Sequence, residues 1–175
     1  TFSGPIGLID LNHQGWSSLF VVEKSKGFRL LKNLNGNFTP HSEPIPFLNS
    51  HTITKVLIGD LQNDRSEDVL ILGTEGSQTI KITEDGSATN VTLPSHLNTL
   101  EATDGILMDL DFTGKLDLVA VTTNKNELQI LRQTNALSFT NITSSSGVPV
   151  TLENATMVVM EDWNHDQVMD IIVNR

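Results

Sequence analysis

Four short polar segments each open with an aspartate and continue with oxygen-bearing side chains at alternate positions. Oxygen atoms spaced in this way along a tight loop converge on one point, and Ca²⁺ takes about six to eight oxygen ligands in proteins. The sequence therefore predicts calcium loops with partly complete ligand sets. Counted from the leading aspartate as position 1, the candidate ligands are Asp60, Asp64 and Asp68 in the second segment, Asp109, Asp111, Thr113 and Asp117 in the third, and Asp162, Asn164, Asp166 and Asp170 in the fourth.

The first segment opens with Asp10 and has no further carboxylate at positions 3, 5 and 9, where Asn12, Gln14 and Ser18 stand. We expect Asp10 to stabilise its turn by accepting hydrogen bonds from backbone amides, which needs no metal. The same role is open to the other three leading aspartates. Crowded carboxylates repel one another without a cation, and this favours a metal in those three loops. None of the loops is an EF-hand, because position 12 lies in an apolar run and holds no glutamate.

The leading aspartates recur at intervals of 50, 49 and 53 residues, which identifies an internal repeat. An apolar residue stands two positions before each aspartate, and an apolar run begins nine positions after it. These runs predict a buried strand after each loop. Alternating residues at 78–82 and 127–130 predict a third strand in the unit, and residues 37–39, 90–92 and 138–140 predict a fourth.

Four short strands in about fifty residues are typical of a β-propeller blade. We therefore expect an all-β chain with four antiparallel strands per blade and blades at about residues 4–50, 54–98, 104–150 and 156–175. The last unit has room for two strands only. Residues 1–175 then form a partial propeller of three full blades and about half of a fourth, from a seven-bladed ring. The remaining blades come either from a longer chain or from a second copy in a homodimer.

The pattern D-x-[DN]-x-[DN]-G-x-x-D-[LIV], once per unit between its first two strands, resembles the FG-GAP and VCBS repeats of integrin-α-like propellers. Four loops in register carry this resemblance along essentially the whole chain, and one of them is MDLDFTGKLDLVAV, from Met108. The Phe-Gly and Gly-Ala-Pro motifs of integrin repeats are absent, so the chain is closer to the divergent bacterial VCBS-like branch. The resemblance implies Ca²⁺ in the loops and an extracellular, cell-surface or periplasmic recognition module.

Composition excludes several classes of function. The chain has 21 acidic and 11 basic residues, a net charge of −10 and no cysteine. Nucleic-acid binding needs clustered lysine and arginine, and disulfides or thiolate metal sites need cysteine, so none of these is expected. Every apolar run is much shorter than the roughly 20 residues of a membrane-spanning helix. No phosphate-binding loop, nucleophile elbow or dinucleotide motif occurs.

These observations predict a non-catalytic scaffold that binds a protein or glycan through loops between strands. The alternative is the propeller portion of a polysaccharide lyase or hydrolase. Such an enzyme would place a convergent pair of carboxylates, or a histidine with a basic residue, on the inner strands. The inner strands are nearly all apolar, which favours the scaffold.

Three further expectations concern the loops. Position 2 is apolar in every loop and is predicted to anchor the loop on its blade, so Trp163 is expected in the core. Trp16, at position 7 of the first loop, is expected at the surface instead. Gly15 and Gly114, at position 6, are predicted to have positive φ because the turn is sharp there.

Overall fold

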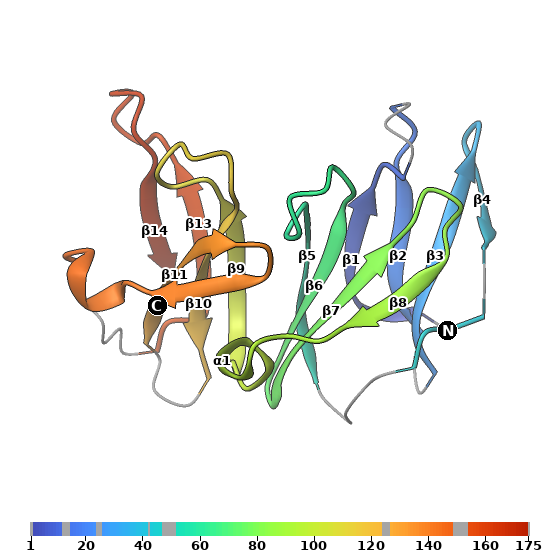
Figure 1. The fold of residues 1–175 in the computed structure, drawn as a ribbon, viewed down its shortest axis with the longest axis horizontal. Coiled ribbons are helices and arrows are strands. Elements are labelled where there is room, and N and C mark those ends of the chain that lie inside the picture. Colours follow the sequence, from blue (N-terminus) through green and yellow to red (C-terminus); the bar gives the residue numbers. More distant parts are fainter. Residues whose placement is uncertain are drawn as a thin grey trace.

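The computed structural model describes residues 2–11, 15–23, 26–41, 43–46, 52–123, 127–148 and 154–174. This part of the chain consists of short antiparallel strands, with one α-helix, α1 (Ser95–Asn98), and one 3₁₀ turn, η1 (Thr143–Ser145) (Figure 1). The predicted all-β class is confirmed. Within these residues, no helix is long and apolar enough to cross a membrane.

The described strands form three four-stranded sheets and one two-stranded sheet, and strands adjacent in sequence pair antiparallel. The first sheet contains β1 (Phe2–Ile9), β2 (Ser18–Glu23), β3 (Gly27–Leu34) and β4 (Asn37–Pro40). The second contains β5 (Ile53–Gly59), β6 (Asp68–Gly73), β7 (Gly76–Ile82) and β8 (Ala88–Val91). The third contains β9 (Ala102–Met108), β10 (Asp117–Thr122), β11 (Leu128–Asn135) and β12 (Ser138–Asn141), and the fourth contains β13 (Met157–Glu161) and β14 (Asp170–Asn174).

The second strands of the second and third sheets are buried on both faces, which explains their continuous apolar sequences. Every residue of β6 and β10 is buried. In β6, Val69 and Ile71 join the core that the second sheet shares with the first. Leu70 and Leu72 point the other way and join the core shared with the third. A third core lies between the third and fourth sheets. The sheets therefore pack on one another in chain order, and their first strands, β1, β5, β9 and β13, contact one another in the same order.

Asp104 ties three of these sheets together from the inner strand β9. Its Oδ1 lies 2.8 Å from Nζ of Lys55 on β5, and its Oδ2 accepts a 2.9 Å hydrogen bond from the backbone N–H of Val158 on β13. Asp104 is buried. A buried carboxylate needs such partners, because an unpaired charge is costly to bury.

Position 2 of the first three loops packs on the following sheet, and this explains why the expectation for Trp163 was wrong. Leu61 is buried and its carbonyl accepts a 2.6 Å hydrogen bond from Nε2 of Gln133 in the third sheet. Leu11 and Leu110 pack against the next sheets in the same way. Trp163 is 75% exposed, because no sheet packs on the far side of the fourth sheet in the described part of the chain. Trp16 is exposed, as expected.

Candidate functional site

The leading aspartates stand at the start of the loops between the first and second strands, and Figure 1 shows the loops of the second, third and fourth sheets along one edge of the molecule. Each leading aspartate of the second, third and fourth loops accepts hydrogen bonds from the backbone amides at positions 5 and 6, and Asp10 accepts one from the amide at position 6. The donors are Gly15 to Asp10 (2.8 Å), Asp64 and Arg65 to Asp60 (3.0 and 2.7 Å), Thr113 and Gly114 to Asp109 (2.9 and 2.7 Å), and Asp166 and Gln167 to Asp162 (3.0 and 2.9 Å). The turn-capping role expected for Asp10 is thus common to all four aspartates.

The aspartates at position 9 of the second, third and fourth loops accept a hydrogen bond from the other end of their loop. Asp68, Asp117 and Asp170 each begin a strand and accept a hydrogen bond from the position 2 amide. The distances are 2.9 Å from Leu61, 3.1 Å from Leu110 and 3.1 Å from Trp163. Burial raises the pKa of Asp68 and Asp117, because a charged carboxylate is less well solvated at these positions.

Side chains at positions 3 and 5 make bonds within their own loops. Asp111 Oδ1 accepts a 2.7 Å hydrogen bond from the Thr113 hydroxyl. Asp64 Oδ1 accepts one of 3.0 Å from the Ser66 amide. Asn164 Nδ2 donates to Asp166 Oδ2 at 2.9 Å. Asn12 and Gln14 of the first loop lie outside the described residues.

The predicted calcium ligands of each loop lie near one another, but their side-chain oxygens accept hydrogen bonds from within the loop. In the described ranges, no three acidic or histidine side chains are placed to share a metal ion. Calcium binding therefore stays a prediction, while the geometry gives the carboxylates a capping role.

Two basic residues that no sequence pattern indicated lie beside these carboxylates. Lys81 of β7 forms an ion pair with Asp64, and Arg132 of β11 has Nε 3.1 Å from Oδ2 of Asp111. The second contact is an ion pair whose geometry falls short of a hydrogen bond, since Arg132 Nε has no hydrogen-bond partner in the part of the chain that the structure describes. The hydrogen bond from Lys81 lowers the pKa of Asp64, and the same bond raises the pKa of Lys81.

The loops share a left-handed residue at position 6. Gly15 and Gly114 have φ of 79° and 80°, as predicted. Arg65 and Gln167 adopt φ of 70° at the same position although they carry a Cβ. The loop shape is therefore kept without glycine, at a cost in backbone strain.

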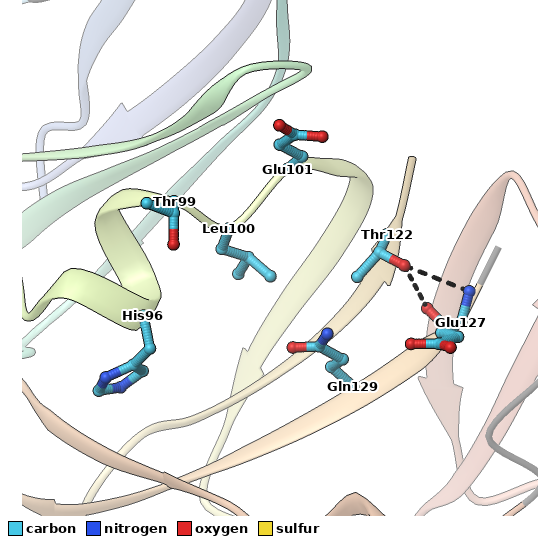
Figure 2. Close-up of a pocket in the computed structure, with 7 residues that line it drawn as sticks. All are labelled: His96, Thr99, Leu100, Glu101, Thr122, Glu127 and Gln129. Carbon is cyan, nitrogen blue, oxygen red and sulfur yellow. Dashed lines mark hydrogen bonds between the residues drawn. The ribbon is translucent and has the colours of Figure 1, made fainter. Parts of the chain in front are cut away.

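A polar pocket of about 340 Å³ lies at the opposite end of β10 from the aspartate loop. Its walls come from α1, the start of β9 and the ends of β10 and β11 (Figure 2). The lining residues are His96, Thr99, Leu100, Glu101, Thr122, Glu127 and Gln129. The Thr122 hydroxyl accepts a 3.2 Å hydrogen bond from the Glu127 amide. Two carboxylates line this pocket, but Figure 2 shows that those of Glu101 and Glu127 do not point toward one another.

Residues 109–173 match the family model described as an FG-GAP-like repeat, and this confirms the resemblance found in the loops over that part of the chain. The chain matches no curated protein sequence. Among solved structures, it is similar to a chain of the Tc holotoxin pore from Photorhabdus luminescens, with a TM-score of 0.60 and 20% identity. That match covers 96% of this chain and 8% of the toxin chain. At this identity the likeness concerns the fold alone, and it supports a β-propeller-like all-β repeat fold.

Proposed function

We propose that this chain, with its FG-GAP-like repeat over residues 109–173, is part of a β-propeller that acts as a non-catalytic recognition scaffold. The ligand is a glycan or a polar protein segment. The scaffold belongs to an exported or cell-surface protein, as the family resemblance implies. The sheets provide a rigid frame, and the surface between them provides specificity.

The pocket beside α1 is the observation that carries this proposal. It has room for a small polar group, and amide, hydroxyl, imidazole and carboxylate side chains line it from separate elements. Such mixed donors and acceptors suit a sugar or a polar peptide segment. The carboxylates of Glu101 and Glu127 come from different sides of the pocket (Figure 2), which suits binding better than general acid–base catalysis.

A glycan microarray tests the proposal, with Gln129→Ala as the pocket variant and Glu84→Ala as the control. Glu84 is exposed in the turn between β7 and β8, outside the pocket. Loss of a hydrogen bond costs about 0.5–1.5 kcal/mol, so Gln129→Ala should bind roughly three- to tenfold more weakly. Glu84→Ala should bind like the unmodified chain. Equal binding by the unmodified chain and Gln129→Ala would place the site elsewhere.

The second candidate is a polysaccharide lyase or hydrolase, because two carboxylates line the same pocket. The chain would then release unsaturated products or new reducing ends from uronic-acid polysaccharides. Glu101→Gln and Glu127→Gln would each abolish the turnover. Polysaccharide turnover by the unmodified chain that each of the two substitutions abolishes would contradict the scaffold proposal and support the enzyme.

The end faces of the stack support a larger ring of blades. Ile6 and Leu8 on β1 are 60% and 63% exposed, whereas Val56 and Val158, the equivalents of Ile6 on β5 and β13, are buried by the preceding sheet. We propose that further blades of a seven-bladed propeller pack on Ile6 and Leu8. A longer chain is one source of these blades, and a second copy is the other.

Calcium remains part of the proposal for the fourth loop. No ion pair with a basic side chain engages Asp162, Asp166 or Asp170 among the described residues, unlike the second and third loops. A ligand that binds only the folded state raises its stability. A melting temperature unaffected by millimolar Ca²⁺ and by EDTA would remove calcium from the proposal.

A further inference from the structure

Lys81 lies among the carboxylates of the second loop. Its ammonium group pairs with Asp64 at position 5. The β6–β7 ladder also places Lys81 directly across from Asp68 at position 9. A single fixed cation on the third strand therefore faces two of the three carboxylates to which the sequence assigned a calcium ion.

Arg132 holds the same place beside the third loop. Its Nε is 3.1 Å from Oδ2 of Asp111. Leu131 pairs with Leu118 in the β10–β11 ladder, so Arg132, the next residue, lies across from Asp117. The basic group again comes from the third strand and again faces the position 9 aspartate.

The first sheet provides an internal comparison. Leu19 pairs with Leu31, so Lys32 lies across from Ser18 at position 9. A basic residue thus stands at this place in all three four-stranded sheets. Only the second and third loops have a carboxylate opposite it.

We propose that Lys81 and Arg132 are built-in counter-cations that hold the second and third loops closed in place of a metal ion. A fixed positive charge beside the loop neutralises the crowded carboxylates and repels a divalent cation from the same oxygens. The capping bonds from Asp60 and Asp109 then keep the turn in shape. The two loops are accordingly metal-independent, and this conclusion does not rest on the proposed ligand pocket.

The test is a calcium titration followed by amide NMR, because it resolves each loop separately. In the unmodified chain, the Arg65 and Gly114 amides should not move as Ca²⁺ is raised to millimolar concentrations. In Lys81→Met, which keeps the apolar stem but removes the charge, the Arg65 amide should shift and saturate. In Arg132→Met, the Gly114 amide should do so.

Melting temperatures provide a second measurement. Lys81→Met should melt about 2–4 °C lower than the unmodified chain in EDTA, and millimolar Ca²⁺ should restore part of the loss. Lys81→Arg keeps the charge and should behave like the unmodified chain. Lys32→Met is the matched control, since its loop lacks the opposing carboxylate, and it should gain no response to Ca²⁺.

Two results would overturn the proposal. One is a saturable shift of the Arg65 or Gly114 amide resonance in the unmodified chain. This measurement does not depend on whether the variants fold. The other is a folded Lys81→Met chain that melts like the unmodified chain in EDTA and shows no calcium response at Arg65.

Discussion

Several turns of this molecule are stabilised by a carboxylate that accepts hydrogen bonds from backbone amides. The turn between β7 and β8 follows the same principle as the aspartate loops. Asp85 accepts hydrogen bonds from the Thr83 hydroxyl at 2.6 Å, the Ser87 amide at 2.9 Å and the Ser87 hydroxyl at 3.0 Å. Such bonds favour the ionised carboxylate, because each donor stabilises negative charge.

These donors, with the Thr83 hydroxyl first, lower the pKa of Asp85 to about 2 from an ordinary value of 3.8. The folded-state pKa lies below the unfolded one, so the contribution of Asp85 to stability is present above about pH 4 and is lost as the pH falls toward 2. Thr83→Ala should move the pKa of Asp85 back toward 3.8. Carboxyl ¹³C NMR titration of both chains measures this, and a midpoint near 3.8 in the unmodified chain would contradict the geometry.

Backbone strain at position 6 leads to a second prediction at this scale. A left-handed residue with a Cβ costs about 1–2 kcal/mol, and glycine avoids this cost but loses about 0.5–1 kcal/mol through its more flexible unfolded chain. Because Gln167 has φ of 70°, Gln167→Gly should therefore raise the unfolding free energy of the chain by up to about 1.5 kcal/mol. Val168→Gly, one residue later and without positive φ, should lose stability. Urea unfolding measures the unfolding free energy of both variants. A lower value than that of the unmodified chain in both would mean that Gln167 is not strained.

At the scale of elements, the repeat made the strands predictable. Each loop is followed by a strand that begins at position 9, one residue before the predicted apolar run. The predicted third strands at 78–82 and 127–130 overlap β7 and β11, and the predicted fourth strands overlap β4, β8 and β12, whereas β3 was not predicted. Periodic patterns of this kind depend on the local chain, and the sequence contains them directly.

The partners of the loop carboxylates were not predictable in the same way. Lys81 follows Asp68 by 13 residues, Arg132 follows Asp117 by 15, and Lys32 follows Ser18 by 14. The turns between the second and third strands differ in length, so equivalent residues do not recur at a fixed spacing. Only the ladder register shows that the three basic residues share one place. Register across a turn is set by turn geometry and packing together.

The junction between β7 and α1 depends on Gly76. This residue has φ of 130°, which only glycine adopts readily, and a Cβ there would lie 2.3 Å from the carbonyl oxygen of Asn98 at the end of α1. Gly76→Ala should therefore destabilise the chain by about 3 kcal/mol or more, since backbone atoms must move. It should also displace α1, which walls the pocket.

Gly36→Ala is the control for this prediction. Gly36 has φ of 90° in the turn between β3 and β4, and a Cβ there would meet nothing within 4 Å. Gly36→Ala should lower the unfolding free energy only by the cost of placing a Cβ residue at positive φ, about 1 kcal/mol. Urea unfolding distinguishes the two variants. Equal losses would show that the contact with Asn98 contributes nothing.

For the whole molecule, the order of the sheets decides which residues are buried. Trp163 was expected in the core because position 2 is apolar in every loop, yet burial of that position depends on a following sheet. The residue pattern of one repeat does not indicate whether a neighbouring sheet covers a given side chain. The same dependence leaves Ile6 and Leu8 exposed at one end of the stack, and Met157 and Val159 exposed at the other.

Exposed apolar strand faces at both ends should make residues 1–175 associate or bind apolar dyes in dilute solution. Leu8 is 63% exposed and Val159 is 39% exposed, each on the first strand of an end sheet. The pair of substitutions Leu8→Lys and Val159→Lys should therefore reduce both association and dye fluorescence, because charged side chains on these faces oppose packing of another sheet. Phe112→Lys is the matched control, since Phe112 is 84% exposed but lies in a loop away from either face, and it should change neither property. Light scattering with an apolar-dye titration measures both. A monodisperse monomer that binds no dye before substitution, or an equal response to Phe112→Lys, would mean that the end faces are ordinary surface and not the sites where further blades pack.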